Sequence, residues 1–401
     1  EPPVVLNGQI LEGEVDRFPL RARKGQRLVI RTQARALVPY VADAVPGWFQ
    51  AVVALYDPKG KEIAYADDFR FDPDPVLYYE IPEDGEYRLE IRDSIYRGRE
   101  DFVYRVTLSE QPFITRLFPL GGRAGAATVA SIAGWNLPES RLSLDTRAGL
   151  GSIRRAALPV GKGTSNSVSY EVGTLPEVSE IEPNDTGKDS HLVALPVIVN
   201  GRISRPGDVD VFRIEGRAGD EVVAEVRARR LGSPLDPLLQ IYSAAGQKVA
   251  MNDDTVDPEF GLVTHHADSY VRLKIPKDGP YFVRLSDSQS HGDDSHAYRL
   301  HLRRPTPDFA LRVTPSSVSM PGTGTAVLTA HVVRRDGFDG DVDLALAGAP
   351  EGFRLGGARV PHGRNSVRIT LSAPPMRPFR ASGPLAIRIE GQAKIGGVIV
   401  I

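Results

Sequence analysis

The chain has 401 residues, of which 41% are hydrophobic and 25% charged, and its net charge is −2 at pH 7. This length exceeds one ordinary β-sandwich and predicts roughly three or four domains. The lack of a basic excess argues against a nucleic-acid binder, no run of about 18 apolar residues exists to span a membrane, and the absence of cysteine excludes disulfides and thiolate metal sites.

Glycine and proline, rather than helix formers, shape the composition. The chain has 39 Gly and 32 Pro against 3 Met, which favours short strands joined by turns over helices. A cytosolic chain of this length usually retains a few thiols, so the absence of cysteine favours an exported protein. No signal peptide is visible at Glu1, as in a mature or trimmed polypeptide. We therefore expect an all-β, extracytoplasmic protein.

The first predicted domain, residues 1–111, has the pattern of a β-sandwich. Residues 27–33 carry β-branched side chains in partial alternation, and the Asp57–Gly60 segment is a hairpin turn signal between two similar runs. An excursion over residues 38–49 interrupts this pattern. Exposed aromatic side chains on loops are common anchors for protein or sugar ligands, so the candidate ligand-binding residues are Tyr40, Trp48 and Phe49. The alternative is that members of this set fill the core.

The second predicted domain, residues 112–178, is a small immunoglobulin-like domain. Residues 113–118, 127–137 and 168–172 read as short strands, and Gly-rich turns separate them. The length of this segment suits a compact sandwich between two larger ones.

The third predicted domain, residues 179–304, repeats the pattern of the first. The displacement is about 194 positions at both ends of the repeat and about 186 in its middle, and the order of the matches is preserved over about a hundred residues. We interpret this as duplication of one sandwich module. The matched strings include Asn7–Ile10 with Asn200–Ile203, Val15–Phe18 with Val209–Phe212, Ile81–Tyr87 with Ile275–Tyr281, and Tyr104–Leu108 with Tyr298–Leu302.

The fourth predicted domain, residues 305–401, follows a Pro-rich linker and is a second immunoglobulin-like sandwich. Alternating runs at residues 309–313, 326–333 and 342–346 support this assignment, as do the Asp-Gly turns between them. The predicted fold is therefore all-β, with two jelly-roll or immunoglobulin-like modules alternating with two smaller immunoglobulin-like sandwiches.

A short acidic string precedes the second module. Glu180-Ile-Glu-Pro-Asn-Asp-Thr186, together with Gly207–Phe212 and Asp278–Tyr281, resembles the bacterial pre-peptidase C-terminal (PPC) domain, a family related to the collagen-binding domains of bacterial collagenases. The resemblance covers both modules and is specific for the second, because the first lacks the acidic lead-in. The segment from Phe113 to Trp135 resembles the small IPT/TIG-like domains of bacterial surface proteins.

The resemblance implies a non-catalytic appendage that in some members binds structural calcium. Calcium prefers six to eight oxygen ligands, which clustered carboxylates and an amide can supply. The resemblance then implies the metal ligands Glu180, Glu182, Asn184, Asp185, Asp208 and Asp210. In the first module Glu14 and Asp16 match Asp208 and Asp210, without a lead-in. The alternative for the acidic string is a solvated turn whose side chains bond their own backbone.

Catalytic motifs are missing from the sequence. It contains no Gly-x-Ser-x-Gly, no His-Glu-x-x-His and no complete phosphate-binding loop, so we predict no catalytic residues. The predicted function is a non-catalytic secreted or cell-surface protein that acts in adhesion or substrate targeting. A structural spacer in a larger surface protein or exported enzyme is the alternative, and an enzyme with a site assembled through space is a third. We expect a monomer whose partner is an extracellular protein or polysaccharide.

Overall fold

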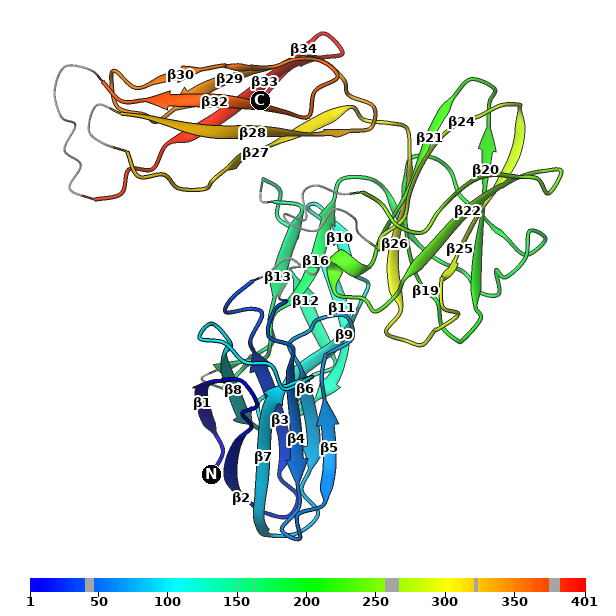
Figure 1. Cartoon of the computed structure of the whole chain (residues 1–401). Coiled ribbons are helices and arrows are strands. Elements are labelled where there is room, and N and C mark those ends of the chain that lie inside the picture. The colour runs from blue at the N-terminus through cyan, green and yellow to red at the C-terminus, as the bar shows by residue number, and fades with distance from the viewer. Residues whose placement is uncertain (40–46, 150, 162, 257–266, 321–323, 375–382) are drawn as a thin grey trace. The chain divides into compact units, whose positions relative to one another are not determined.

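The computed structural model describes residues 1–39, 47–149, 151–161, 163–256, 267–320, 324–374 and 383–401 (Figure 1). Its regular structure is almost entirely β, which confirms the predicted all-β class of tandem sandwiches; the described helical element is one 3-10 turn, Arg229–Leu231 (η1). Within the described residues, no helix is both long and apolar enough to cross a membrane. The chain divides into two compact units, one made of Glu1–Asp220 with Ala224–Arg303 and one of Glu221–Val223 with Arg304–Ile401.

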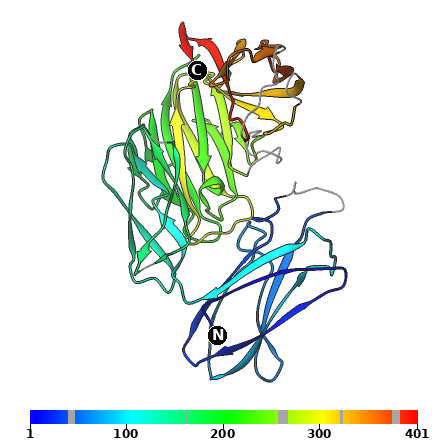
Figure 2. The same cartoon turned by 90° about the vertical axis from the view of Figure 1, so that its left-hand side faces the viewer.

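The first sandwich, coloured blue to cyan in Figure 2, stacks a sheet of order β1-β8-β3-β6 on one of order β2-β7-β4-β5. Side chains that alternate along the strands, such as Leu28 and Ile30 in β3 and Leu89 and Ile91 in β7, meet in one buried core. The strands are Val4–Gln9 (β1), Asp16–Ala22 (β2), Arg27–Gln33 (β3), Ala51–Tyr56 (β4), Glu62–Ala66 (β5), Val76–Glu80 (β6), Gly85–Asp93 (β7) and Val103–Ser109 (β8).

Three short sheets, of order β12-β11-β9, β10-β16-β13 and β14-β15, follow the first sandwich. Their core contains Ile114, Leu142 and Tyr170. The strands are Phe113–Phe118 (β9), Gly121–Arg123 (β10), Thr128–Trp135 (β11), Arg141–Leu144 (β12), Ile153–Ala156 (β13), Pro159–Val160 (β14), Gly163–Thr164 (β15) and Val168–Gly173 (β16).

The second large sandwich has the sheet orders β17-β19-β26-β21-β24 and β18-β20-β25-β22-β23. Apart from β17 and β18, which pair in parallel at the edges, this order repeats that of the first sandwich strand for strand. The strands are Glu177–Ser179 (β17), His191–Leu192 (β18), Val197–Arg202 (β19), Val209–Gly216 (β20), Glu221–Arg227 (β21), Pro237–Ser243 (β22), Lys248–Asn252 (β23), Tyr270–Lys274 (β24), Gly279–Asp287 (β25) and Ala297–Arg303 (β26).

The two large sandwiches also share a contact outside the strand pairing, in which a buried carboxylate binds the main-chain amides of a turn. In the first, Asp74 accepts main-chain N–H bonds from Ala34, Arg35 and Ala36 at 2.7–2.9 Å. In the second, Asp268 accepts bonds from the main chain of residues 228–230 at 2.6–3.3 Å. Both carboxylates are buried, and each satisfies a turn whose amides have no strand partner.

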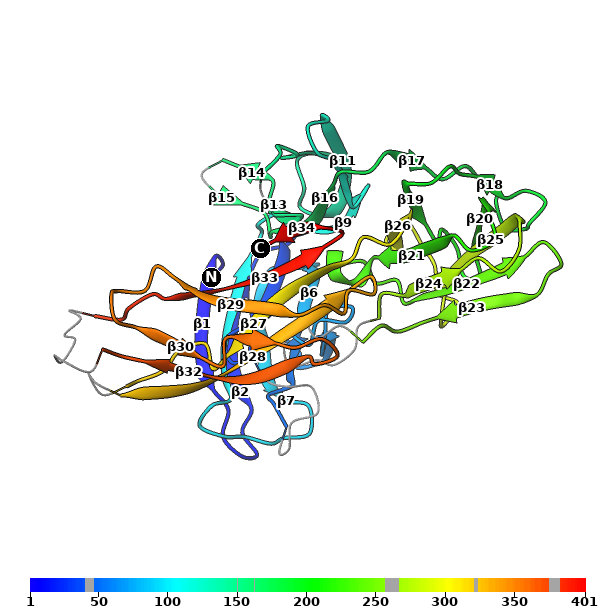
Figure 3. The ribbon, with the colours of Figure 1, turned by 90° about the horizontal axis from the view of Figure 1, so that it is seen from above.

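The C-terminal unit is a sandwich of sheets β27-β28-β32-β30 and β31-β29-β33-β34 (Figure 3). Its core includes Leu328, Ala330, Val342 and Ile369. The strands are Asp308–Thr314 (β27), Thr325–Arg335 (β28), Val342–Ala347 (β29), Arg354–Gly356 (β30), Arg359–Val360 (β31), Ser366–Ser372 (β32), Arg388–Ile395 (β33) and Val398–Val400 (β34).

Candidate metal site

The acidic lead-in of the second large sandwich runs along the edge of a sheet. β17 pairs in parallel with β19, and the N–H of Glu180 continues this pairing by donating to the carbonyl of Asn200 at 3.0 Å. Four residues further on, the carbonyl of Asn184 accepts a bond from the N–H of Val211 in β20 at 3.0 Å. The lead-in therefore crosses from one sheet to the other, over the start of β20.

Three carboxylates converge where the lead-in crosses. One oxygen each of Glu180, Glu182 and Asp210 lies within 4.8 Å of the others. Glu180 accepts the N–H of Arg202 at 2.8 Å, and the hydroxyl of Tyr298 lies 2.9 Å from Glu180 and 2.5 Å from Asp210. Because a hydroxyl donates a single proton, Tyr298 satisfies only one of these two carboxylates at a time.

Gly201 leaves the space that this arrangement needs. A Cβ atom at Gly201 would lie 2.2 Å from a Glu180 carboxylate oxygen and 2.3 Å from the Tyr298 hydroxyl. The repeat itself contained a signal for both residues, since Gly201 and Tyr298 match Gly8 and Tyr104 of the first module. Sequence reasoning did not connect them with the acidic string.

Crowding of the acidic groups disfavours their ionised forms. Burial, and then the charge of Glu180, raise the pKa of Asp210 well above its usual range. Burial likewise raises the pKa of Glu180, where the hydrogen bonds from Tyr298 and Arg202 oppose it and the charge of Glu182 adds to it. Glu182 is exposed, but carboxylates as buried as Asp210 are stable beside other acidic groups only if they hold a proton or face a cation.

Asn184 is fully buried beside these carboxylates. If its amide nitrogen faces them, it donates to Asp210 at 3.1 Å and to Glu182 at 3.2 Å. If its amide oxygen faces them, oxygens meet with no proton between them, which is the arrangement that a bound cation requires. Its N–H additionally donates to Glu182 at 3.0 Å.

Asp208 and Asp185 lie beside the cluster rather than in it. Asp208 is 2% exposed, and one of its oxygens accepts bonds from the N–H and hydroxyl of Ser204 at 2.6 and 2.9 Å. Its other oxygen has no hydrogen-bond partner among the described residues and lies 3.3 Å from the Arg205 guanidinium. Asp185 forms an ion pair with the same guanidinium at 2.8 Å. Arg205 therefore supplies positive charge beside the cluster, a role that the sequence did not indicate.

The equivalent position of the first sandwich contains fewer acidic groups. Asp16 accepts a hydrogen bond from the Tyr104 hydroxyl, as Asp210 does from Tyr298. Glu14, the counterpart of Asp208, accepts the N–H of Leu11 at 2.8 Å. In the described part of the chain, no strand equivalent to β17 lies beside β1, so no second layer of carboxylates faces Asp16.

The aromatic residues predicted to bind a ligand have different environments. Phe49 is 5% exposed, belongs to the core and stacks on Phe102 with ring centroids 5.2 Å apart. The alternative that this side chain fills the core therefore fits better than a surface anchor. Trp48 is half-buried, with the Arg35 guanidinium 4.9 Å from its ring centroid. Tyr40 lies outside the described residues.

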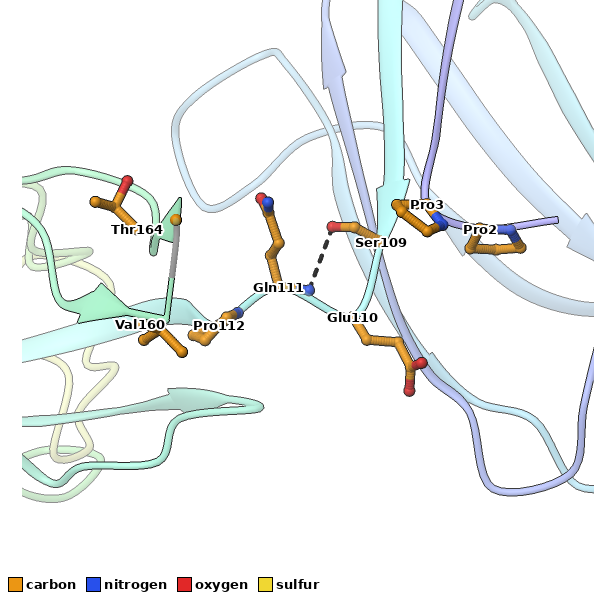
Figure 4. A pocket seen from close by; sticks show the side chains of 9 residues that line it. Pro2, Pro3, Ser109, Glu110, Gln111, Pro112, Val160 and Thr164 are labelled. Atoms are coloured by element: carbon orange, nitrogen blue, oxygen red, sulfur yellow. Dashed lines mark hydrogen bonds between the residues drawn. The ribbon is translucent and has the colours of Figure 1, made fainter.

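A cavity of about 360 Å³ lies between the strand ends at Ser109 and Val160. Figure 4 shows Pro2, Pro3 and Pro112 around it, and the Gln111 N–H donates to the Ser109 hydroxyl at 3.3 Å. Its described lining includes one carboxylate, Glu110, whose oxygen accepts the N–H of Arg27 at 3.1 Å, and no histidine. This cavity therefore has no paired acid and base in its described lining.

Comparisons with known proteins identify a relative that matches part of the sequence. No family model matches the chain. Over 125 residues it is 34% identical to a probable subtilase-type serine protease of Deinococcus radiodurans, a match that covers 29% of this chain and 16% of the protease. The chain thus spans only a small part of that relative's length.

Two solved structures show weaker likenesses. The pre-peptidase C-terminal domain of a Bacillus anthracis collagenase is similar over 31% of this chain and 100% of that domain, with 10% identity and a TM-score of 0.23. Escherichia coli alpha-2-macroglobulin activated by porcine elastase is similar over 97% of this chain and 43% of its own, with 11% identity and a TM-score of 0.13. At these TM-scores neither likeness supports a functional argument.

Proposed function

We propose that the chain is a non-catalytic, extracytoplasmic part of a secreted or cell-surface protein, built from two PPC modules and two immunoglobulin-like domains. The domains are residues 1–111, 112–178, 179–304 and 305–401. Support comes from the Glu-x-Glu-Pro-Asn-Asp string at 180–185, from the shared strand order of the large sandwiches and from the sequence match to a part of a subtilase-type protease.

The second module binds one structural calcium ion in this proposal, and the convergence of Glu180, Glu182 and Asp210 carries it. Carboxylate oxygens and the Asn184 amide oxygen are hard ligands of the kind that calcium takes. Asp208, with a buried oxygen that lacks a hydrogen-bond partner among the described residues, completes the set, either directly or through water. Asp185 serves as the partner of Arg205.

Calcium here would attach the lead-in to the sandwich. The ligands come from the lead-in and from β20, so the ion joins two segments that otherwise repel each other electrostatically. The chain's own residues contribute the oxygens, the Tyr298 hydroxyl that orients Asp210, and the space at Gly201.

We propose that the chain acts in substrate targeting or adhesion. Among the described residues, Trp48 of the first sandwich is the aromatic candidate for ligand contact. A specific observation favours the spacer role as a second candidate. Glu171 of β16 is 1% exposed and accepts bonds from Arg299 at 2.8 Å and from Arg227, both of the second sandwich. Buried ionic contacts between consecutive domains fix their geometry, which is what a spacer requires.

Thermal melts of the full chain with calcium and with chelator test the calcium proposal. Calcium should raise the melting temperature of the wild type, because a ligand that binds only the folded state stabilises it. Asp210→Asn should lose that rise and should melt higher than the wild type in chelator, since it removes the free-energy cost of keeping a buried carboxyl group protonated. Asp16→Asn, the matched change in the first module, should leave the calcium-induced rise intact. An equal rise in Asp210→Asn would refute the site.

A further inference from the structure

A second cavity, of about 640 Å³, lies within the first compact unit. Residues of the first sandwich, of the small sheets and of the second sandwich line it together. Its size is in the range of sites that hold small organic ligands. Its lining differs from the rest of the chain in charge, because it contains six guanidiniums and only two carboxylates. These groups belong to Arg31, Arg70, Arg116, Arg155, Arg229 and Arg230, and to Asp72 and Asp74.

Two of these arginines are neutralised by acidic partners. Arg230 pairs with Asp268 at 2.6 Å and Arg116 with Asp294 at 2.9 Å. Asp72 and Asp74 offset part of the remaining positive charge, although the oxygens of Asp74 are already occupied by the main-chain amides of residues 34–36. The cavity therefore keeps a positive excess in a chain whose net charge is −2.

The other four arginines have no acidic partner among the ion pairs of the described residues. Arg70 donates to the carbonyls of Gly232, at 2.9 Å, and Thr115. Arg155 donates to the carbonyl and hydroxyl of Ser167 at 3.2 Å. Carbonyl acceptors satisfy N–H groups but leave the cationic charge without a counter-charge.

Arg70 is partly buried and lies near charges of both signs. Burial lowers the pKa of this guanidinium, the charge of Asp293 opposes that effect, and the charge of Arg116 adds to it. Burial is thus the main disadvantage for this guanidinium, and a bound anion would reduce it.

One exposed aromatic ring, that of Phe71, accompanies the positive charge. Phe71 is 42% exposed, and the Arg229 guanidinium lies 4.5 Å from its ring centroid. Phe69 packs edge-on against Phe113 with centroids 5.5 Å apart. Gln33 and Ser169 add amide and hydroxyl groups to the lining. Guanidiniums bind carboxylate or sulfate groups, whereas aromatic faces with neutral polar groups suit sugar rings.

From this lining we infer that the cavity binds a short anionic oligosaccharide, whose carboxylate or sulfate groups contact Arg31, Arg155 and Arg229. The inference is separate from the calcium site, since no residue of the Glu180 cluster lines the cavity. A peptide ligand fits less well. Extended peptides commonly bind along a free strand edge, whereas this lining offers guanidiniums, an aromatic ring and neutral polar groups.

Calorimetric titration of the full chain with defined oligosaccharides tests the inference. The probes are a tetra-uronate, a sulfated tetrasaccharide, neutral maltotetraose and a polyglutamate peptide. We expect at least one anionic sugar to bind, with affinity that falls as salt is raised, and maltotetraose to bind at least tenfold more weakly. The stronger of the two anionic sugars then identifies the charged group.

Variants locate the site. Arg31 and Arg155 are exposed, so Arg31→Gln with Arg155→Gln should fold normally and lower the affinity at least tenfold. Arg123→Gln with Arg141→Gln, two exposed arginines outside the cavity, should leave the affinity within twofold of wild type. Equal loss in both double variants, stronger binding of polyglutamate than of either sugar, or no binding of either anionic sugar would overturn the inference.

Discussion

At the scale of single residues, Asp210 and Glu180 decide how the second sandwich responds to its solution. Both are held against the Tyr298 hydroxyl, which can satisfy one of them. Without a cation the site must retain protons at pH values where carboxyl groups are normally ionised. The same oxygens become favourable ligands when a divalent ion is present.

The raised pKa of Asp210 predicts a pH dependence in chelator. The folded state keeps a proton that the unfolded chain releases above about pH 4, so this group's contribution to the free energy of unfolding falls as pH rises toward the raised pKa. Between pH 6 and 8 the wild type should therefore lose stability relative to Asp210→Asn in denaturant titrations. Saturating calcium should abolish the difference in slope, and parallel curves in chelator would contradict the raised pKa.

Glu171 provides a prediction at a buried ion pair. Burial raises its pKa, but His301, Arg227 and Arg299 outweigh this and hold the pKa below its usual range. Glu171→Gln should lower the free energy of unfolding by about 3 kcal/mol, because it removes a buried negative charge that faces two guanidiniums. Each guanidinium keeps one other carboxylate, Glu225 for Arg227 and Glu177 for Arg299. Glu215→Gln, which breaks an exposed pair with Arg213 at 3.1 Å, should cost less than about 1 kcal/mol. Equal effects in urea titrations would refute the distinction.

At the scale of elements, the alternation of strand residues predicted the all-β class, and the tandem sandwiches confirm it. Alternation is a local pattern, so it can be recognised in the sequence without knowing which strands pair. The roles of Asp74 and Asp268 could not be predicted in this way, since each reaches amides about 40 positions earlier in the chain. For Phe49 the sequence left a surface position and a core position open, and its burial and stacking on Phe102 favour the core position.

The acidic string illustrates the same limit. Sequence predicted its residue types, and the structure brings Glu180, Glu182 and Asp210 together. The sequence could not show that Asp185 lies outside this group. Asp185 directly follows Asn184, yet its side chain pairs with Arg205 instead.

Asp74→Asn tests the element-scale role of a buried carboxylate. One amide oxygen cannot replace two carboxylate oxygens that accept three N–H bonds, so the free energy of unfolding should fall by about 2 kcal/mol. Asp84→Asn is the control, since Asp84 is exposed and accepts a single amide, that of Lys24, at 2.7 Å. Chemical denaturation that ranks Asp84→Asn as the more damaging change would contradict this assignment.

At the scale of the whole molecule, the two compact units should unfold separately. Each has its own buried core, and domains with separate cores can unfold in separate transitions. Ile369→Ala, in the C-terminal core, should cost about 3 kcal/mol and move one calorimetric transition only. Leu89→Ala, in the first sandwich, should move a different transition. A single transition that shifts equally in both variants would show that the units are coupled.

The number of calcium ions bound per chain tests the central claim most directly, because the two large sandwiches differ in the acidic lead-in and share their strand order. Isothermal titration of the calcium-free full chain should give one site per chain, absent from Asp210→Asn and retained in Asp16→Asn. No binding, or one site that persists in Asp210→Asn, would contradict the account.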